Sequence, residues 1–322
     1  MKKIFLLLCG LFCLCVSCKR GLTLKVDNGS IGKASEVLVV MNKSIFGTIM
    51  EDSIRTLLAI PQPGINQIEG MFDALVLDEQ FFNSDKQRHY NIVQFTLTND
   101  TISPICTIDH GVWTHPQIYV QIKAHTPDEA LTCFIEHQIE ICNALYDNDI
   151  AKIQGAYEKI LNVELQRRIK EKFGILLTVT KDYNVAREGD DFLWLAYRTA
   201  VNDRFIMIYR SDSTILTRES LINNRNRICR QYIEGEKDNI HPIVTQLASL
   251  PYVQPIQLGK KVGMEMRGLW ETENDYMGGP FYHFSYVNDY GKCISVDGFV
   301  YAPNESKRDY IRQVEAIVKS VK

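Results

Sequence analysis

The alternation of apolar and polar residues predicts that the folded chain begins as a mixture of strands and helices. Residues 36–41 are an apolar, β-branched run typical of a buried strand. Residues 45–58 repeat apolar side chains at helical spacing, and alternation predicts further strands at 72–76, 91–98 and 117–124.

The clearest helix start is at residues 126–129. Their sequence, Thr-Pro-Asp-Glu, is a capping box with proline at the first helical position. The apolar stripe predicts one helix from there through Leu145. It predicts a second helix at about 149–173, which Gly174 would end as a left-handed cap.

Beyond Gly174 the pattern again begins with an apolar strand, at residues 175–180. The other predicted elements are strands at 191–199, 204–210, 280–287 and 292–301, a helix at 218–233 and a final helix from Glu305.

Both halves end in a strand, an alanine, a short polar cap and an amphipathic helix, at 117–145 and 295–321. We therefore predict an α+β fold of two related halves, residues 35–173 and 174–322. Each half would be a mainly antiparallel sheet with helices packed on one face. The alternative is a chance likeness, because a strand followed by a turn and a helix is common.

The first residues have the three zones of a secretory signal peptide: two lysines, an apolar run at 4–16, and Ser17 before Cys18. Residues 14–18 fit the box after which bacterial lipoproteins are cleaved. As a helix the apolar run would reach roughly 20 Å, too short for a hydrocarbon core of roughly 30 Å. Cleavage without lipid is the other alternative.

We accordingly predict a signal peptide at 1–17, lipid on Cys18 and a short tether at 18–34. The membrane is then the first partner, reached through the acylated cysteine. Lys19 and Arg20 follow the anchor instead of acidic residues, which favours a location in the cell envelope that faces the periplasm.

Composition excludes some classes of function. Hydrophobic residues make up 45% of the 322 residues and charged residues 23%, as in ordinary globular proteins. Removing Lys2 and Lys3 from 36 basic residues leaves 34 against 39 acidic ones, a net charge of −5. Nucleic-acid binding would need a basic surplus, so it is not expected. The sequence has no phosphate loop or dinucleotide fingerprint, and no cofactor is expected.

The cysteines beyond Cys18 are odd in number: Cys106, Cys133, Cys142, Cys229 and Cys293. Cys133 and Cys142 lie nine apart in one predicted helix. They would be roughly 13 Å apart along its axis and on opposite faces, so we predict that they are not bonded. Buried free thiols are the favoured interpretation.

Three groups suggest chemistry but are better explained by structure. His110 and His115 are five apart, which is no standard ligand spacing, so no metal is expected. His137 could be a general base, but its helix face is more simply solvated. Three arginines of one helix could grip phosphate or lipid headgroups, but helical geometry spreads them over several faces: Arg225, Arg227 and Arg230.

Residues 267–286 are the most suggestive segment, because aromatic rings there lie beside carboxylates around a Gly-Gly-Pro turn. Such a loop suits sugars or peptides, and a carboxylate pair could hydrolyse glycosides. The simpler interpretation is a loop that packs its aromatics onto the sheet. The candidate ligand-binding residues are Trp270, Glu271, Glu273, Asp275, Tyr276 and Tyr282.

Several short motifs resemble a known family, the Bacteroidota lipoproteins called domain of unknown function 4837. They are residues 36–40, 63–64, 192–194, 278–281 and 298–303, with Lys307 and Arg308. The resemblance spans nearly the whole mature chain and implies a Gram-negative envelope. It implies no activity and no catalytic residue.

These observations predict an envelope lipoprotein that is a non-catalytic binding or scaffold module for a partner protein or an envelope polymer. The alternative is an envelope hydrolase that acts on glycan or peptide through Glu271, Glu273 and Asp275. Two carboxylates that face each other across a cleft at about 5–10 Å would favour the hydrolase.

Overall fold

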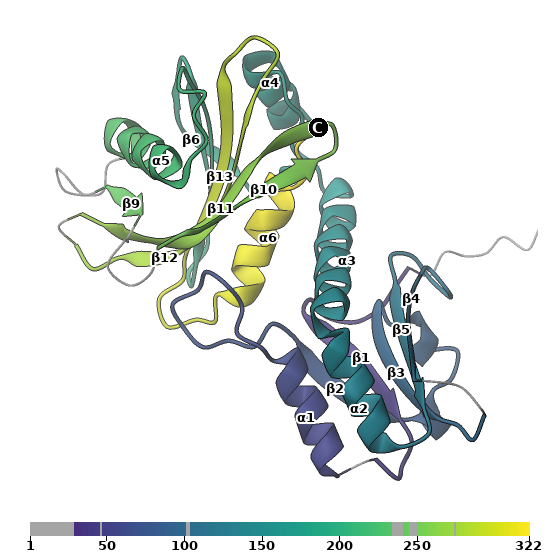
Figure 1. Cartoon of the computed structure of the whole chain (residues 1–322). Helices are drawn as coiled ribbons and strands as arrows, with labels where there is room; N and C mark the ends of the chain where they lie inside the picture. Colours follow the sequence, from purple (N-terminus) through teal and green to yellow (C-terminus); the bar gives the residue numbers. More distant parts are fainter. Residues whose placement is uncertain (1–28, 46, 101–103, 234–240, 245–249, 274) are drawn as a thin grey trace, which may run out of the picture.

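A computed structural model describes residues 29–45, 47–100, 104–233, 241–244, 250–273 and 275–322. The predicted signal peptide and Cys18 lie outside these residues, so lipidation of Cys18 stays a prediction. The described chain forms two α+β parts, one at each end of an elongated molecule (Figure 1). The predicted division into two α+β halves is therefore confirmed.

The first part is a five-stranded sheet with strand order β2-β1-β3-β5-β4. Strands β2, β1, β3 and β5 run parallel, and only β4 is antiparallel to its neighbour. The prediction of a mainly antiparallel sheet is wrong here. A helix connects β1 to its parallel neighbour β2, and β4 lies in the chain between the parallel neighbours β3 and β5, so each of these connections returns the chain to the same end of the sheet. The strands are β1 (Glu36–Met41), β2 (Asp73–Asp78), β3 (Asn91–Leu97), β4 (Ile105–His110) and β5 (Ile118–Ala124).

Helices cover one face of this sheet (Figure 1). The capping box is confirmed: the Thr126 side chain accepts the backbone N–H of Glu129 at 3.2 Å. The helix that it starts ends at His137 rather than at Leu145. The Nδ1 atom of His137 lies 2.9 Å from the carbonyl of Cys133, where it competes with the helix backbone. The helices are α1 (Ile49–Leu58), α2 (Pro127–Glu136) and α3 (Gln138–Glu158), with 3₁₀ turns η1 (Glu79–Phe81) and η2 (Lys86–Arg88).

The second part is an antiparallel sheet with strand order β10-β11-β12-β13-β8-β7-β6, and β9 also pairs with β11. Its antiparallel character is as predicted. The strands are β6 (Asn184–Gly189), β7 (Phe192–Arg198), β8 (Asp203–Ser211), β9 (Pro242–Val244), β10 (Tyr252–Leu258), β11 (Lys261–Thr272), β12 (Gly278–Val287) and β13 (Cys293–Tyr301).

Helices lie on both faces of the second sheet, contrary to the prediction of one covered face (Figure 1). Helix α5 (Arg218–Tyr232) packs on one face. Helices α4 (Val163–Phe173) and α6 (Arg308–Val318) pack on the other. The long strands are apolar on both sides, as Phe192 and Leu193 of β7 show, and each side therefore needs a cover.

The two halves are not copies of one unit. Their sheets differ in strand order and in direction, which is the outcome that rules out the predicted duplication. Residues 175–180, predicted as the matching first strand, instead lie along the C-terminal residues. Leu176 and Lys322 exchange backbone hydrogen bonds of 3.0 and 3.1 Å. The similar endings reflect only how often a strand leads into a capped helix.

The boundary between the parts lies near residue 160 rather than at 173. Leu165, Ile169 and Phe173 of α4 belong to the core of the second part. The predicted single helix from 149 to 173 is consequently two, since α3 ends at Glu158 and α4 begins at Val163.

All five cysteines of the described chain are free, as expected for Cys133 and Cys142. The prediction that both residues lie in one helix is wrong, because Cys133 lies on α2 and Cys142 on α3. Four of the five are buried, which agrees with their use as small apolar side chains.

Helix α6 of the second part docks into the first part through a buried arginine. Arg312 is fully buried and lies 2.5 Å from Asp149 of α3. It also donates to Ser35 at 2.9 Å, to Gln62 at 3.0 Å and to the carbonyl of Met71 at 2.5 Å. A buried guanidinium is tolerated only when its donors are matched in this way.

The N-terminus of α6 is capped by the other part of the chain. The carboxylate of Glu69 accepts the backbone N–H groups of Lys307 and Arg308 at 2.7 and 2.9 Å. A carboxylate there satisfies otherwise unpaired helix donors and opposes the helix dipole. The two parts are therefore held together by specific, directional contacts.

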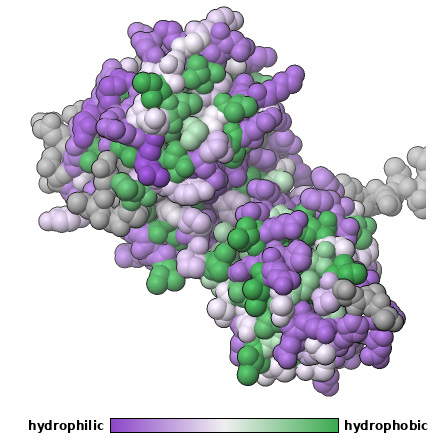
Figure 2. Space-filling model, in the orientation of Figure 1, coloured by the Kyte–Doolittle hydropathy of each residue, from purple (hydrophilic) through white to green (hydrophobic). Residues whose placement is uncertain are grey.

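On the face shown in Figure 2, the described residues present small apolar groups separated by polar ones, on both parts of the molecule. Small scattered apolar groups are normal for a protein surface.

Candidate functional site

A cleft of about 520 Å³ lies between the two parts of the chain. The first part contributes α3 and the segment 62–71, and the second contributes β10, β11 and the C-terminal end of α6. Ligand sites occur preferentially between domains, so this cleft is the leading candidate. Its lining residues are Gln62, Pro63, Met71, Asn143, Tyr146, Asp147, Tyr252, Gln254, Ile256, Glu265, Arg267 and Lys319.

Alternation along β11 places two charged side chains at the cleft. Met266 and Trp270 enter the apolar core beneath α5. Glu265 and Arg267 therefore share the opposite face of the strand. Their side chains are only 1% and 14% exposed, so both charges are largely withdrawn from water.

Glu315 of α6 lies fully buried behind this lining. Arg267 donates two hydrogen bonds to it, Nη2 to Oε1 at 2.6 Å and Nη1 to Oε2 at 2.8 Å. The hydroxyl of Tyr146 donates to Oε2, and Nζ of Lys319 lies 3.0 Å from Oε1. Donors from both parts of the chain therefore hold one carboxylate.

These contacts fix the protonation states. Burial alone would raise the pKa of Glu315, but the charges of Arg267 and Lys319 outweigh it and lower the pKa to about 2. Burial would lower the pKa of Lys319, but Glu315 outweighs it and raises that pKa. Both groups stay charged at neutral pH, whereas a general acid or base needs a pKa near the working pH.

Glu265 is the second buried carboxylate. It accepts the hydroxyl of Tyr282 at 2.6 Å and Nε2 of Gln254 at 2.5 Å, and Nη2 of Arg267 lies 3.5 Å away. Burial raises the pKa of Tyr282 well above its ordinary value, so its phenol remains a donor. The cleft thus presents an ordered set of charges and dipoles.

Two family models match the chain, each over one of its parts. Residues 30–158 match a domain of unknown function called DUF8532, and residues 162–320 match the domain of unknown function called DUF4837. The second part of the chain belongs to the DUF4837 family. The resemblance predicted for nearly the whole mature chain is thus too extensive, since residues 36–40 and 63–64 lie in the DUF8532 match.

The likeness to solved structures is weak and supports no assignment of fold or function. A crystal structure from Bacteroides thetaiotaomicron VPI-5482 has a TM-score of 0.25 at 9% identity, and the match covers 46% of this chain and 44% of that one. The human StarD13 (DLC2) lipid transfer and protein localization domain has a TM-score of 0.24 at 10% identity, covering 49% of this chain and 95% of that one. Human StAR-related lipid transfer protein 5 has a TM-score of 0.23 at 12% identity, covering 52% and 96%. No curated protein matches the chain.

In the part of the chain that matches DUF4837, here called the DUF4837 part, the predicted ligand-binding segment forms a hairpin rather than a loop. Strands β11 and β12 pair through it, with Trp270 opposite Gly279. Trp270 is 4% exposed in the core beneath α5, and its Nε1 donates to the carbonyl of Val300 at 3.1 Å. Tyr282 is buried on the other face of the sheet. These two predicted residues therefore share no surface.

Four of the six predicted residues do line one hollow, of about 380 Å³, at the turn of this hairpin: Trp270, Glu271, Asp275 and Tyr276. Tyr276 is fully exposed. Glu273 instead forms an ion pair of 2.7 Å with Arg230, and Asp275 accepts the N–H of Tyr276 at 2.8 Å. Two of the three carboxylates are thus engaged by neighbouring groups.

A serine, a histidine and an aspartate lie in line inside the DUF4837 part. His283 Nδ1 is 3.0 Å from Asp297, and its Nε2 is 2.6 Å from the hydroxyl of Ser285. All three residues are 0% exposed, so this row has no access for a substrate. Arg225 of α5 forms a 2.8 Å ion pair with Asp297, and the row therefore fastens α5 to the sheet.

The remaining sequence candidates are separated by the fold. His110 ends β4 and is exposed. Of the three arginines on α5, Arg225 is buried and Arg230 pairs with Glu273, while Arg227 faces a second hollow. Within the described ranges there is no group of metal-binding side chains. In the same residues no helix has the length and apolar character to cross a membrane.

Sequence reasoning missed the cleft residues, because they come from distant segments of the chain. One signal was available on the last helix. Arg312 and Glu315 lie between apolar positions of its stripe, where charged residues are buried only with partners. That pattern predicts buried polar partners for α6, but it does not identify Tyr146 or Arg267 as the partners of Glu315.

Proposed function

We propose that this chain is a non-catalytic binding protein of the cell envelope, anchored by lipid on Cys18, that holds a short segment of a partner polypeptide in the cleft. The observation that carries the proposal is the buried Glu315 network at the boundary of the two parts. Its charges are matched and permanent at neutral pH, which suits recognition and not proton transfer.

The lining of the cleft suits a peptide chemically. Pro63, Met71 and Ile256 offer apolar contact, while the amides of Asn143 and Gln254 can donate and accept hydrogen bonds. A polypeptide has the matching mixture of apolar side chains, amide donors and carbonyl acceptors. A volume of about 520 Å³ accommodates a few side chains and not a whole domain.

Strand β10 lines the cleft and is the outermost strand of its sheet. Edge strands can take up an extended peptide through backbone hydrogen bonds. Pro255 lies in the middle of β10 and has no N–H to donate, a feature that protects sheet edges from pairing. Recognition therefore rests on side chains such as Tyr252 and Gln254 more than on an added strand.

The hydrolase alternative gains no support from the hairpin. It needs two free carboxylates facing each other, whereas Glu273 pairs with Arg230 and Asp275 accepts a backbone N–H. Cleavage would also need a carboxylic acid with a raised pKa. The pKa of Glu315 is instead lowered, because the charges of Arg267 and Lys319 outweigh the effect of its burial.

A photo-reactive amino acid placed at single tyrosines tests the proposal in intact cells. Tyr252 lines the cleft, Tyr276 belongs to the hairpin hollow, and Tyr290 is 88% exposed and lines neither of them. We expect a discrete cross-linked product from position 252 at a yield at least tenfold above that from position 290.

The three positions also separate the possible sites. A product of defined mass from position 276 alone would move the binding surface to the hairpin and overturn the proposal. Equal yields from all three positions would indicate random collision and would also overturn it.

A further inference from the structure

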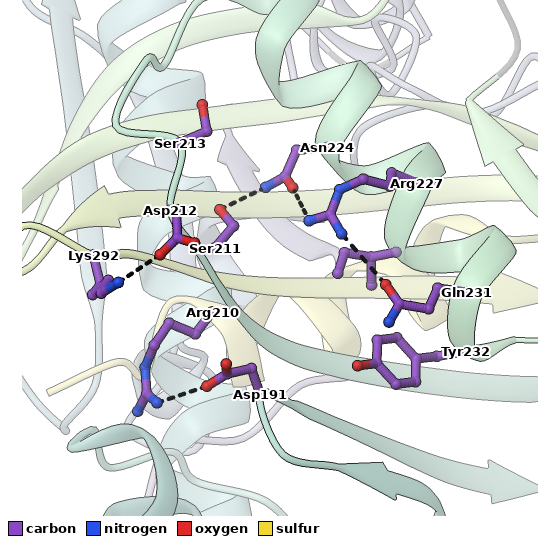
Figure 3. A pocket seen from close by; sticks show the side chains of 11 residues that line it. Asp191, Arg210, Ser211, Asp212, Ser213, Asn224, Arg227, Gln231, Tyr232 and Lys292 are labelled. Atoms are coloured by element: carbon purple, nitrogen blue, oxygen red, sulfur yellow. Dashed lines mark hydrogen bonds and ion pairs between the residues drawn. The ribbon is translucent and has the colours of Figure 1, made fainter.

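A second hollow, the polar pocket, lies on the DUF4837 part between α5 and the ends of β8 and β13. It has a volume of about 580 Å³, within the range of roughly 300–1,000 Å³ usual for small-molecule sites. Three cationic side chains line it, Arg210, Arg227 and Lys292, against two carboxylates, Asp191 and Asp212 (Figure 3). The pocket therefore has one positive charge in excess.

Two of the three cations are already paired with carboxylates. Arg210 donates to Asp191 at 2.7 Å, and Lys292 lies 2.5 Å from Asp212. The hydrogen bonds of Arg227 go to neutral amides, Asn224 at 2.9 Å and Gln231 at 3.4 Å. Within the described part of the chain, Arg227 has no ion pair, so the excess charge resides on its guanidinium.

The Arg227 guanidinium is also oriented. Nδ2 of Asn224 donates to the hydroxyl of Ser211 at 3.0 Å, and the Oδ1 of the same amide accepts from Arg227 (Figure 3). Ser211 belongs to β8 and is 8% exposed, so the amide is fixed to the sheet. A guanidinium held in one plane is prepared for two parallel hydrogen bonds to a carboxylate.

The rest of the lining suits hydroxyl groups and a ring face. Tyr232 stacks on Phe192, with ring centroids 4.2 Å apart and an angle of 6° between the rings. A Cβ atom at Gly189 would lie 2.8 Å from the Tyr232 ring, so glycine is required for the ring to occupy this position. Ser213 and Gln231 supply further donors and acceptors.

We propose that the polar pocket binds an acidic saccharide, with the sugar carboxylate on Arg227 and the sugar hydroxyls on the surrounding amide and serine groups. The proposal stands on a different site from the cleft and does not depend on it. A lone phosphate would use the charge of Arg227 but would leave most of the 580 Å³ hollow unused. The pocket thus fits a carboxylated, hydroxyl-rich ring better than a small inorganic anion.

Calorimetric titration of the intact mature chain tests this inference, with galacturonate and glucuronate oligosaccharides as probes. Neutral galactose oligosaccharides of the same length and inorganic phosphate are the comparisons. We expect an acidic saccharide to bind at least tenfold more tightly than its neutral counterpart. The variant R227Q should weaken it roughly tenfold or more, and R227K should fall between, because lysine keeps the charge but loses the planar fork.

The matched control is R198Q, which removes the same charge from an exposed arginine outside the pocket and should leave the affinity unchanged. Equal weakening by R198Q and R227Q would show only a general charge effect and would overturn the proposal. Equal affinity for acidic and neutral saccharides, binding of phosphate alone, or no binding of any probe at millimolar concentration would each overturn it as well.

Discussion

The cleft and the polar pocket hold their charges in opposite ways. In the cleft, Glu315 is 0% exposed, and its partners Arg267 and Lys319 are 14% and 12% exposed. In the polar pocket, Asp212 is 89% exposed and its partner Lys292 is 48% exposed. Buried charges must be matched within the protein, whereas exposed charges are matched by water.

The two hollows therefore differ in how freely their charges can turn to a ligand. The cleft network joins two parts of the chain, so its charges contribute to how those parts are held as well as to what the cleft presents. The charges of the pocket can be exchanged for those of a ligand at small cost, because water already screens their mutual pairs. The pocket is therefore the more adaptable site and the cleft the more rigid one.

Removing a buried cation should have the largest effect. Arg267→Met leaves Glu315 and Glu265 without their guanidinium, and we expect the free energy of unfolding to fall by about 3–5 kcal/mol. Arg210→Met removes an arginine from the polar pocket and should cost roughly 1 kcal/mol or less. Urea denaturation at pH 7 measures both. Similar losses for the two variants would contradict the comparison.

The second-largest effect should be a loss of folding stability in acid, caused by protonation of Glu315 behind the cleft. Glu315 has a pKa of about 2 in the folded chain against an ordinary 4.5, so its contribution is present above pH 4.5 and is lost as the pH falls toward 2. We expect that loss to be about 3 kcal/mol. Urea midpoints between pH 5 and pH 2 should fall more steeply for the wild type than for Glu315→Gln. Parallel curves would exclude Glu315 as the titrating group.

A double substitution measures how strongly the buried pair of the cleft is coupled. Arg267→Met with Glu315→Met removes both ends of the buried pair, so no carboxylate is left facing an empty position. We expect the double variant to be more stable than the sum of the single effects predicts, by about 1–3 kcal/mol. Strict additivity in the same urea assay would mean that the two side chains are not coupled.

The smallest effect should come from Lys292→Met in the polar pocket. Its partner Asp212 is almost wholly in water, so the pair contributes little. The midpoint of urea unfolding should stay within experimental error of the wild type at low and at high salt. A clear, salt-sensitive loss would show that the pocket is held by its charges as the cleft is.

Local patterns along the chain predicted much of the fold. The capping box at Thr126, strands β3, β5, β7, β8, β12 and β13, and helices α5 and α6 agree with their apolar spacing within a few residues. Strand β6 was missed because its side chains are mostly exposed and show no apolar alternation. Strand β11 was interpreted as part of a loop, because Gly268 and the charged residues around it break the apolar pattern.

The cleft could not be predicted in the same way. Tyr146, Arg267 and Glu315 come from three elements far apart in the sequence, and no spacing rule connects them. The direction of the strands in the first sheet could not be predicted from the sequence either. An apolar strand such as β1 looks alike in a parallel and in an antiparallel sheet, and only its neighbours β2 and β3 decide.

The most direct test of the cleft combines a plug with the cross-linker at position 252. Asn143 is an exposed residue of α3 that lines the cleft, while Glu140 is an exposed residue of the same helix that does not. We expect Asn143→Trp to lower the yield of the cross-linked product at least tenfold, with an unchanged urea midpoint, and Glu140→Trp to leave the yield as in the wild type. An undiminished product in Asn143→Trp would contradict binding in the cleft.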